Sequence, residues 1–298
     1  MALASFVGTT NAAALPTQWS TDAAEVAGRE DLPSPRLPRP FDLPELSHSR
    51  LDAGLAWTAG GAEPNLHGRP LSAIGLVRVS IESPIGDSRR VYVGATYPIA
   101  AALPPDGSGA TKTVFGNGEV FGRVAFPMPS WLATGAVLGI VLPTALYDRG
   151  SPAAEAATTA ISLEPTNFVQ FRPGIFAFRP ALDLRILRGP FVLQAREGID
   201  VEVDSRGLHQ PASVGRLLIH AGVLTEQSVE LSVEATQAYF FTTEFPDSRR
   251  TVFTIGPAAR LSYRHMDVGA GLVTNLFSPL DRNIDQFVAL RLSLMTHL

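Results

Sequence analysis

The sequence contains no cysteine in its 298 residues. This absence excludes a disulfide scaffold, a thiolate metal site and a cysteine nucleophile. Exported proteins that avoid oxidative mispairing share the feature, but many cytosolic proteins also lack cysteine. The lack of cysteine therefore excludes these kinds of site but does not indicate the cellular compartment.

Charged residues are scarce and are not gathered in blocks. They make up 17% of the chain, against about 25% in ordinary soluble domains. The net charge is −4, and the sequence has no run of basic residues. Because nucleic-acid binding depends on a basic surface, we expect no nucleic-acid partner.

Long hydrophobic runs are also missing. The longest nearly apolar run, residues 131–146, is shorter than the ~20 residues that a membrane-spanning helix needs. Gly135, Gly139 and Pro143 interrupt it. We therefore do not expect a transmembrane helix there.

The first 48 residues differ in composition from the rest. Residues 2–8 are apolar and residues 11–14 have the small side chains of a signal cleavage site, although no basic region precedes them. A signal peptide with a cut or misassigned start and a disordered apolar leader both fit, and we favour a signal peptide over residues 1–14. Residues 15–48 are rich in proline, which disfavours strand ladders and helix interiors. We expect a flexible segment there.

From residue 49 to residue 298, apolar and polar residues alternate in segments separated by turn-rich gaps. In the final stretch, Leu290 and Leu292 share one parity while Arg291 and Ser293 share the other. Successive side chains of a strand point to opposite faces, so the pattern predicts strands with one apolar and one wet face. The fold class is all-β, and a last segment that still alternates suggests that the final strand closes the structure.

We count twelve such segments, two of them irregular. In the segment at residues 114–126, Val114 and Val120 are placed on the same apolar face. Residues 166–186 are counted as one strand whose alternation slips, and a β-bulge is expected there. The gaps between segments alternate between long and short, as they do in membrane barrels.

Strand length and aromatic position separate a membrane barrel from a soluble β-sandwich, which also alternates. Several segments alternate over ten to fourteen residues, and a tilted membrane strand needs about 9 to 11. Aromatic residues gather near segment ends, where they are either ordinary strand-end rings or interface girdles. We favour girdles formed by Trp57, Tyr97, Trp131, Tyr147, Tyr239, Tyr263 and Phe277.

The polar faces carry many charged residues. Burying them in a sandwich core would be prohibitive, although they could lie on the wet outer face of a sandwich. In a closed barrel they would face a hydrated lumen. The lumen-lining candidates are Arg78, Glu119, Arg123, Arg196, Arg216, Glu230, Glu234, Arg260 and Arg291.

Over residues 50–298 the chain resembles the outer-membrane β-barrels of Gram-negative bacteria. Leu290, Leu292 and Leu294 match the alternating apolar end of that family, with Leu298 in place of its aromatic last residue. The stretches GNGEVFGRVAFPMP and GAVLGIVLPTALYD look like a hairpin of uncharacterised porin-like proteins. The resemblance implies a closed antiparallel up-and-down barrel of about 12 strands in the cell outer membrane, with outer-membrane lipid and the barrel-assembly machinery as partners.

The expected function is a porin-like channel or transporter for small polar solutes. Lumen charges of both signs would sort solutes by charge and size. The same charges could instead pair and plug the bore, which would give a structural barrel, or the loop at residues 147–165 could serve a surface adhesin. A barrel lipid hydrolase is a further alternative. The sequence does not indicate an oligomeric state.

Residues with catalytic or metal-binding chemistry are not arranged in a motif. The six histidines include no metal-spaced pair such as HExxH. The stretch GDSRR at residues 86–90 is interpreted as a turn, and GNG at residues 116–118 is too short to cradle phosphate and marks a bulge or close approach. We expect no enzyme activity, no metal and no cofactor.

Overall fold

The computed structural model describes twelve stretches of the chain, and all structural statements concern them: residues 49–59, 72–85, 91–103, 112–126, 128–129, 131–148, 151–204, 213–225, 229–241, 250–263, 266–276 and 286–296. These residues belong to one compact unit, Leu37–Leu298. For residues 49–84 the backbone alone is described. The predicted signal peptide at 1–14 and the proline-rich segment at 15–48 lie outside the described residues.

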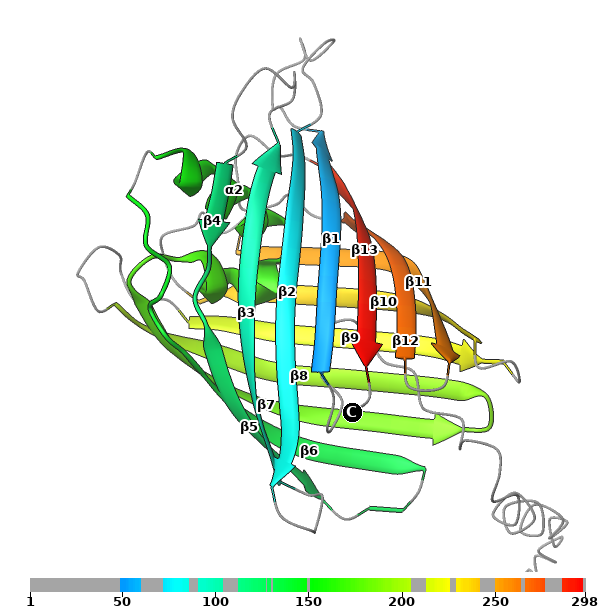
Figure 1. Cartoon of the computed structure of the whole chain (residues 1–298). Helices are drawn as coiled ribbons and strands as arrows, with labels where there is room; N and C mark the ends of the chain where they lie inside the picture. Colours follow the sequence, from blue (N-terminus) through cyan, green and yellow to red (C-terminus); the bar gives the residue numbers. More distant parts are fainter. Residues whose placement is uncertain are drawn as a thin grey trace, which may run out of the picture. The chain divides into compact units, whose positions relative to one another are not determined.

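The described chain is almost entirely antiparallel sheet (Figure 1). It forms a 13-stranded sheet in which successive strands are mostly neighbours. The all-β class predicted from the alternation is confirmed, and so is the up-and-down arrangement that the resemblance implies. The strands are β1 Ser49–Ala59, β2 Ser72–Ile85, β3 Val91–Leu103, β4 Lys112–Phe115, β5 Glu119–Phe126, β6 Leu132–Val141, β7 Ile175–Arg188, β8 Phe191–Asp204, β9 Ser213–Leu224, β10 Val229–Phe240, β11 Thr251–Tyr263, β12 Met266–Asn275 and β13 Gln286–Thr296.

β1 and β13, the first and last strands in sequence order, lie side by side in the sheet. β13 pairs with both β12 and β1, and Leu55 lies opposite Leu290 in the β1–β13 ladder. β1 also pairs with β2, and β2 pairs with β3. The final alternating segment of the sequence is therefore a fully paired strand.

The predicted segment at residues 114–126 is two strands rather than one. β4 and β5 are separated by residues 116–118, and both pair with β3. The prediction that Val114 and Val120 share an exposed apolar face is wrong, because Val114 is buried at 3% exposure while Phe115 and Val120 are exposed. The interruption changes which parity faces outward.

The predicted bulge within residues 166–186 is also wrong. Residues 165–171 form a helical turn, and β7 begins only at Ile175. The β7–β8 ladder keeps one register on both sides of Pro180, with Phe178 opposite Val201 and Ala181 opposite Gly198. The alternation slips because a helix and a strand were joined in one segment.

A helical segment between β6 and β7 replaces the predicted surface loop at residues 147–165. It consists of α2 Pro152–Leu163 and the 3₁₀ helix η1 Pro165–Phe171. Ser151 caps α2, accepting a hydrogen bond from the Ala154 amide, and proline follows at the first helical position, where its missing N–H costs nothing. No helix in the described ranges has the length and apolar character to span a membrane; the apolar run at residues 131–146 forms β6 and the loop after it.

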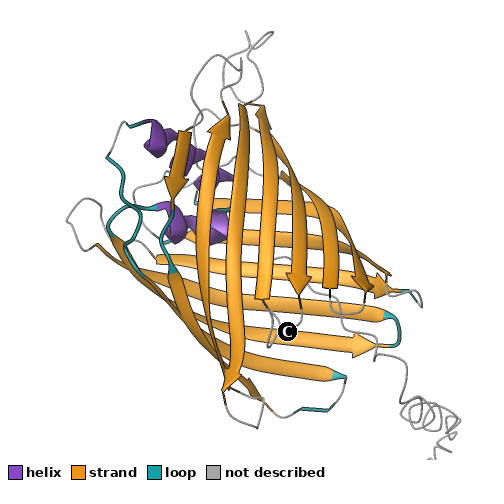
Figure 2. Ribbon diagram, in the orientation of Figure 1, coloured by secondary structure: helices purple, strands orange, loops and turns teal. Residues whose placement is uncertain are grey.

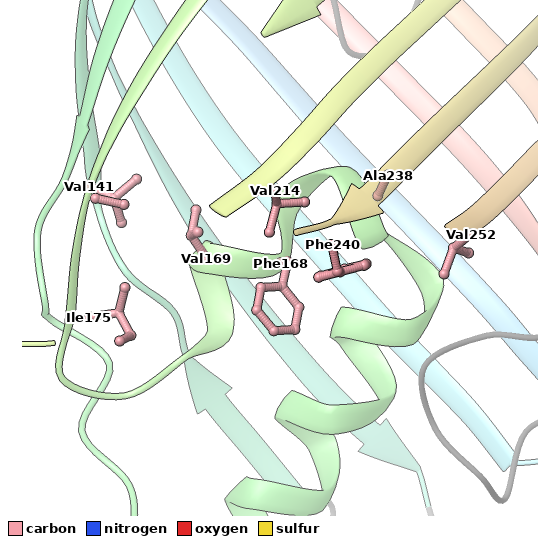
Figure 3. Close-up of a cluster of buried hydrophobic side chains, with 9 residues drawn as sticks. Val141, Phe168, Val169, Ile175, Val214, Ala238, Phe240 and Val252 are labelled. Atoms are coloured by element: carbon pink, nitrogen blue, oxygen red, sulfur yellow. The ribbon is translucent and has the colours of Figure 1, made fainter. Parts of the chain in front are cut away.

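The helical segment lies on the concave face of the curved sheet (Figure 2). We call this face the inner face, and the opposite one the outer face. Ala156, Ala157 and Ala160 of α2 are buried in one apolar cluster with residues of β3, β4, β12 and β13. A second cluster joins η1 to β6, β7, β9, β10 and β11 (Figure 3). The segment therefore touches strands around most of the sheet.

Candidate functional site

Polar residues collect on the inner face, and apolar residues on the outer face. On β8, Gln194 and Arg196 are buried, whereas Leu193 and Val201 are exposed. The period-two geometry of a strand produces this separation. The inner face is the candidate site because its charged groups converge there.

The structure places the predicted lumen-lining residues on the inner face wherever their side chains are described. Glu119 is half-buried, and the side chain of Arg78 lies outside the described part. The remaining candidates have exposures of 9% or less. They are Arg123, Arg196, Arg216, Glu230, Glu234, Arg260 and Arg291.

Arg179 of β7 is the centre of the first charged group. Its Nη1 lies 2.6 Å from Glu119 Oε2, and its Nε lies 3.0 Å from Asp200 Oδ1. Its Nη2 donates to the Thr166 carbonyl at 3.0 Å and to Asn167 Oδ1 at 3.2 Å. One guanidinium thus ties three strands to the helical segment.

Asp200 and Asp183 hold three further arginines of the inner face. Arg216 Nε lies 2.6 Å from Asp200 Oδ1. Arg196 binds Asp183 through two parallel contacts, Nε to Oδ1 at 2.6 Å and Nη2 to Oδ2 at 2.7 Å. Arg123 Nε approaches the same carboxylate at 3.5 Å. The bidentate geometry fixes the guanidinium plane of Arg196.

His220 faces two carboxylates on the neighbouring strand β10. Its Nε2 lies 2.5 Å from Glu230 Oε1, and its Nδ1 lies 3.5 Å from Glu234 Oε1. Gly222 leaves room for this pair, since a Cβ there would lie 2.5 Å from Glu230 Oε1. Glu230 and Glu234, both predicted to line a lumen, are thus held against His220.

Asn117 anchors the helical segment to the wall. Its Nδ2 donates to the carbonyls of Val169 and Arg172 at 2.8 and 2.7 Å, and its Oδ1 accepts from the Ala145 amide at 2.8 Å. Its own amide donates to the Gln170 carbonyl at 2.6 Å. The GNG stretch is therefore a close approach, because a Cβ at position 116 would clash with the Gln170 carbonyl.

Arg172, just after η1, joins the apolar and charged parts of the site. Its guanidinium lies 4.8 Å from the ring centroid of Phe168 and 2.5 Å from Glu202 Oε2. Phe168 packs edge-on against Phe240 with centroids 4.9 Å apart, and Figure 3 shows the two side chains next to each other. These contacts hold η1 and the residue after it against β8 and β10.

Tyr147, a predicted girdle residue, belongs instead to the inner contacts. Its hydroxyl donates to the Phe171 carbonyl, and its ring packs against the cluster that contains α2. Burial raises the pKa of the Tyr147 hydroxyl, although the charge of Arg172 opposes this. The hydroxyl therefore keeps its proton and remains a donor.

Of the other six predicted girdle residues, three have described side chains and three do not. Tyr97, Trp131 and Tyr239 are exposed at 37%, 53% and 39%. Tyr239 packs edge-on against Phe241. The side chains of Trp57 and Tyr263 and the whole of Phe277 lie outside the described part of the chain.

Sequence reasoning missed the residues that organise the site. Arg179 lay where a register slip was expected, so its face could not be assigned. Asn117 was visible only as a glycine-flanked polar residue, which signalled a close approach but not its partner. Asp183 and Arg172 carried no motif, and alternation within a correctly bounded β7 would have placed Arg179 and Asp183 on one face.

No protein-family model matches the chain, and no curated protein matches it. Among solved structures, an outer membrane channel from Pseudomonas putida F1 aligns with a TM-score of 0.59 and 9% identity, over 87% of this chain and 99% of that one. The NanC porin aligns with a TM-score of 0.50 and 8% identity, over 83% and 100%. The likeness is one of fold, that of outer-membrane β-barrel proteins.

Proposed function

We propose that the chain forms a closed barrel of twelve strand positions in the cell outer membrane and acts as a porin-like channel or transporter for small polar solutes. Pairing of β2 with both β1 and β3, and of β13 with β1, supports closure. β4 and β5 pair with different stretches of β3 and so count as one position.

The outer face supports a membrane location. Leu182, Leu231 and Leu272 are exposed at 64%, 58% and 49%, each within a strand. Exposing so many large apolar side chains to water would be costly, whereas a bilayer covers them. Most strands have 10 to 14 residues, enough to cross with the usual tilt. Lipid and the barrel-assembly machinery are the partners that this proposal requires.

The observation that carries the functional proposal is the charged inner face. Arg123, Asp183 and Arg196 lie on β5, β7 and β8 and turn toward the enclosed side. In a barrel of this strand number the interior is intermediate between a filled core and a wide pore. Small hydrated solutes are therefore the class that such a lumen would admit.

A plugged structural barrel is the second candidate, and the helical segment favours it. Phe168, Val169 and Phe171 are buried at 5% or less on the inner face. Arg179 of the wall, held by its ion pair with Glu119, donates hydrogen bonds to this segment. If the segment never moves, the same fold would be an anchoring protein without conductance.

Planar-bilayer recordings separate the two candidates. A channel gives reproducible ion steps from the purified, folded protein, and Phe168→Ala should enlarge them because it removes a ring from the inner segment. Phe178→Ala is the matched control, since Phe178 is 41% exposed on the outer face. Silence from a folded, heat-modifiable barrel would favour the structural candidate. Release of fatty acid from phospholipid vesicles would instead support the third alternative, a barrel lipid hydrolase.

A further inference from the structure

Glu197 is an acidic residue in the apolar outer face of β8. It lies midway along Phe191–Asp204 and is exposed. The other residues of β8 on the same parity are all apolar: Phe191, Leu193, Ala195, Ile199, Val201 and Val203. Glu197 therefore interrupts an otherwise continuous lipid-compatible row.

The neighbouring strands provide no partner for this carboxyl group. Leu182 of β7 and Leu217 of β9 lie directly opposite Glu197. In the described ranges, the Glu197 side chain makes no hydrogen bond or ion pair. The only other titratable residue on the outer parity of β7 and β9 is Arg188, at the turn end of β7. No described residue of β7 or β9 therefore compensates for an acid at mid-strand.

A carboxyl group facing hydrocarbon is unfavourable, and ionisable residues inside membranes normally have a partner. A protonated carboxyl group has one O–H donor and an acceptor oxygen, so two such groups can satisfy each other. A twofold contact between identical chains places the same surface patch against itself. A second copy would thus bring to this site the group that Glu197 needs.

We propose that two copies of the chain associate through the outer faces of β7–β9, about a twofold axis beside Glu197, so that the two Glu197 carboxyl groups hydrogen-bond to each other. The surrounding contact is apolar, formed by side chains such as Leu182 and Ile219, exposed at 64% and 37%. The inference rests on the proposed membrane location. It does not depend on whether the lumen conducts.

Cysteine cross-linking tests the axis directly, because the natural chain has no cysteine. Glu197→Cys is oxidised in the intact membrane, before detergent is added. A disulfide needs Cβ atoms within about 3.5–4.5 Å. Leu193→Cys and Val201→Cys are matched controls on the same face, each about 13 Å away along the strand. In a dimer with its axis beside residue 197, the two copies of either control cysteine would be too far apart to form a disulfide.

The expected result is a cross-linked dimer from Glu197→Cys and only monomer from the two controls. Without oxidation, Glu197→Gln should remain dimeric because an amide also donates and accepts, whereas Glu197→Leu should become monomeric. Heat-modifiable migration checks that each variant is folded. Three results would overturn the proposal. They are a monomer from Glu197→Cys, an equal amount of cross-linked dimer from all three cysteine variants, or a Glu197→Leu protein that dimerises as well as the unchanged protein. Conductance is measured separately, so failure of the channel function would leave these results intact.

Discussion

The Arg179 guanidinium of β7 lies 2.6 Å from the Glu119 carboxylate of β5, although β6 runs between their strands. Gly139 of β6 makes this contact possible. It pairs with Arg179 on one side and Phe121 on the other, and a Cβ there would overlap the Glu119 carboxylate. The ion pair therefore passes over a position that only glycine leaves open.

Gly139→Leu should destabilise the protein by separating this ion pair. The side chain would displace the half-buried Glu119 carboxylate from Arg179, which keeps Asp200 as its second partner, at a cost of about 1.5–3 kcal/mol. Gly122→Ala is the control, because a Cβ there meets only ordinary contact at 3.8 Å. Urea unfolding in detergent micelles measures both. Equal midpoints for the two variants would contradict the role assigned to Gly139.

Asn117→Ala should loosen the helical segment without unfolding the sheet. It removes the two side-chain donors to Val169 and Arg172 and the acceptor for Ala145, and each buried group left unpaired costs about 1–3 kcal/mol. Amide hydrogen exchange should rise in η1 while strand protection persists. Ser232→Ala, which loses one hydrogen bond far along the chain, should leave η1 unchanged. If η1 exchange stayed at the wild-type rate, Asn117 would not be its anchor.

Asp183→Asn should increase preference for anions if the lumen conducts. The substitution removes the negative charge shared by Arg196 and Arg123. It should also cost about 1.5–3 kcal/mol in charge-assisted hydrogen bonds. The zero-current potential in a salt gradient should shift toward the anion's equilibrium potential. Asp148→Asn, at an exposed loop position, should not shift it, and a shift toward cations in Asp183→Asn would contradict the prediction.

Stability should fall at alkaline pH because of Tyr147. Its pKa is raised in the folded protein above the ordinary value of 10.0, so the unfolded chain loses this proton first. The stabilisation is complete below about pH 10 and declines as pH rises above it. Tyr147→Phe should flatten this part of the curve and also lose the hydrogen bond to Phe171. Unfolding free energies compared from pH 8 to pH 11 check this, and an unchanged alkaline slope in the variant would refute it.

Local pattern was enough to predict most strands, but not the break between β4 and β5 or the segment between β6 and β7. Residues 266–275 alternate strictly and form β12 as expected. In contrast, Ser151 and Pro152 are a helix start signal that an all-β interpretation passed over. The inward position of η1 could not be read from its own residues, because Phe168 and Val169 would be equally apolar against lipid or against the inner wall.

The sequence by itself determined which residues share a face, since side-chain alternation is a property of each strand alone. It therefore placed Arg196, Arg216 and Glu234 together on one polar surface. Only the tertiary structure decided that Arg179 meets Glu119 and that Asn117 holds η1, because these contacts join residues 52 to 60 positions apart. Their partners depend on strand order and register, which no local stretch of the chain contains.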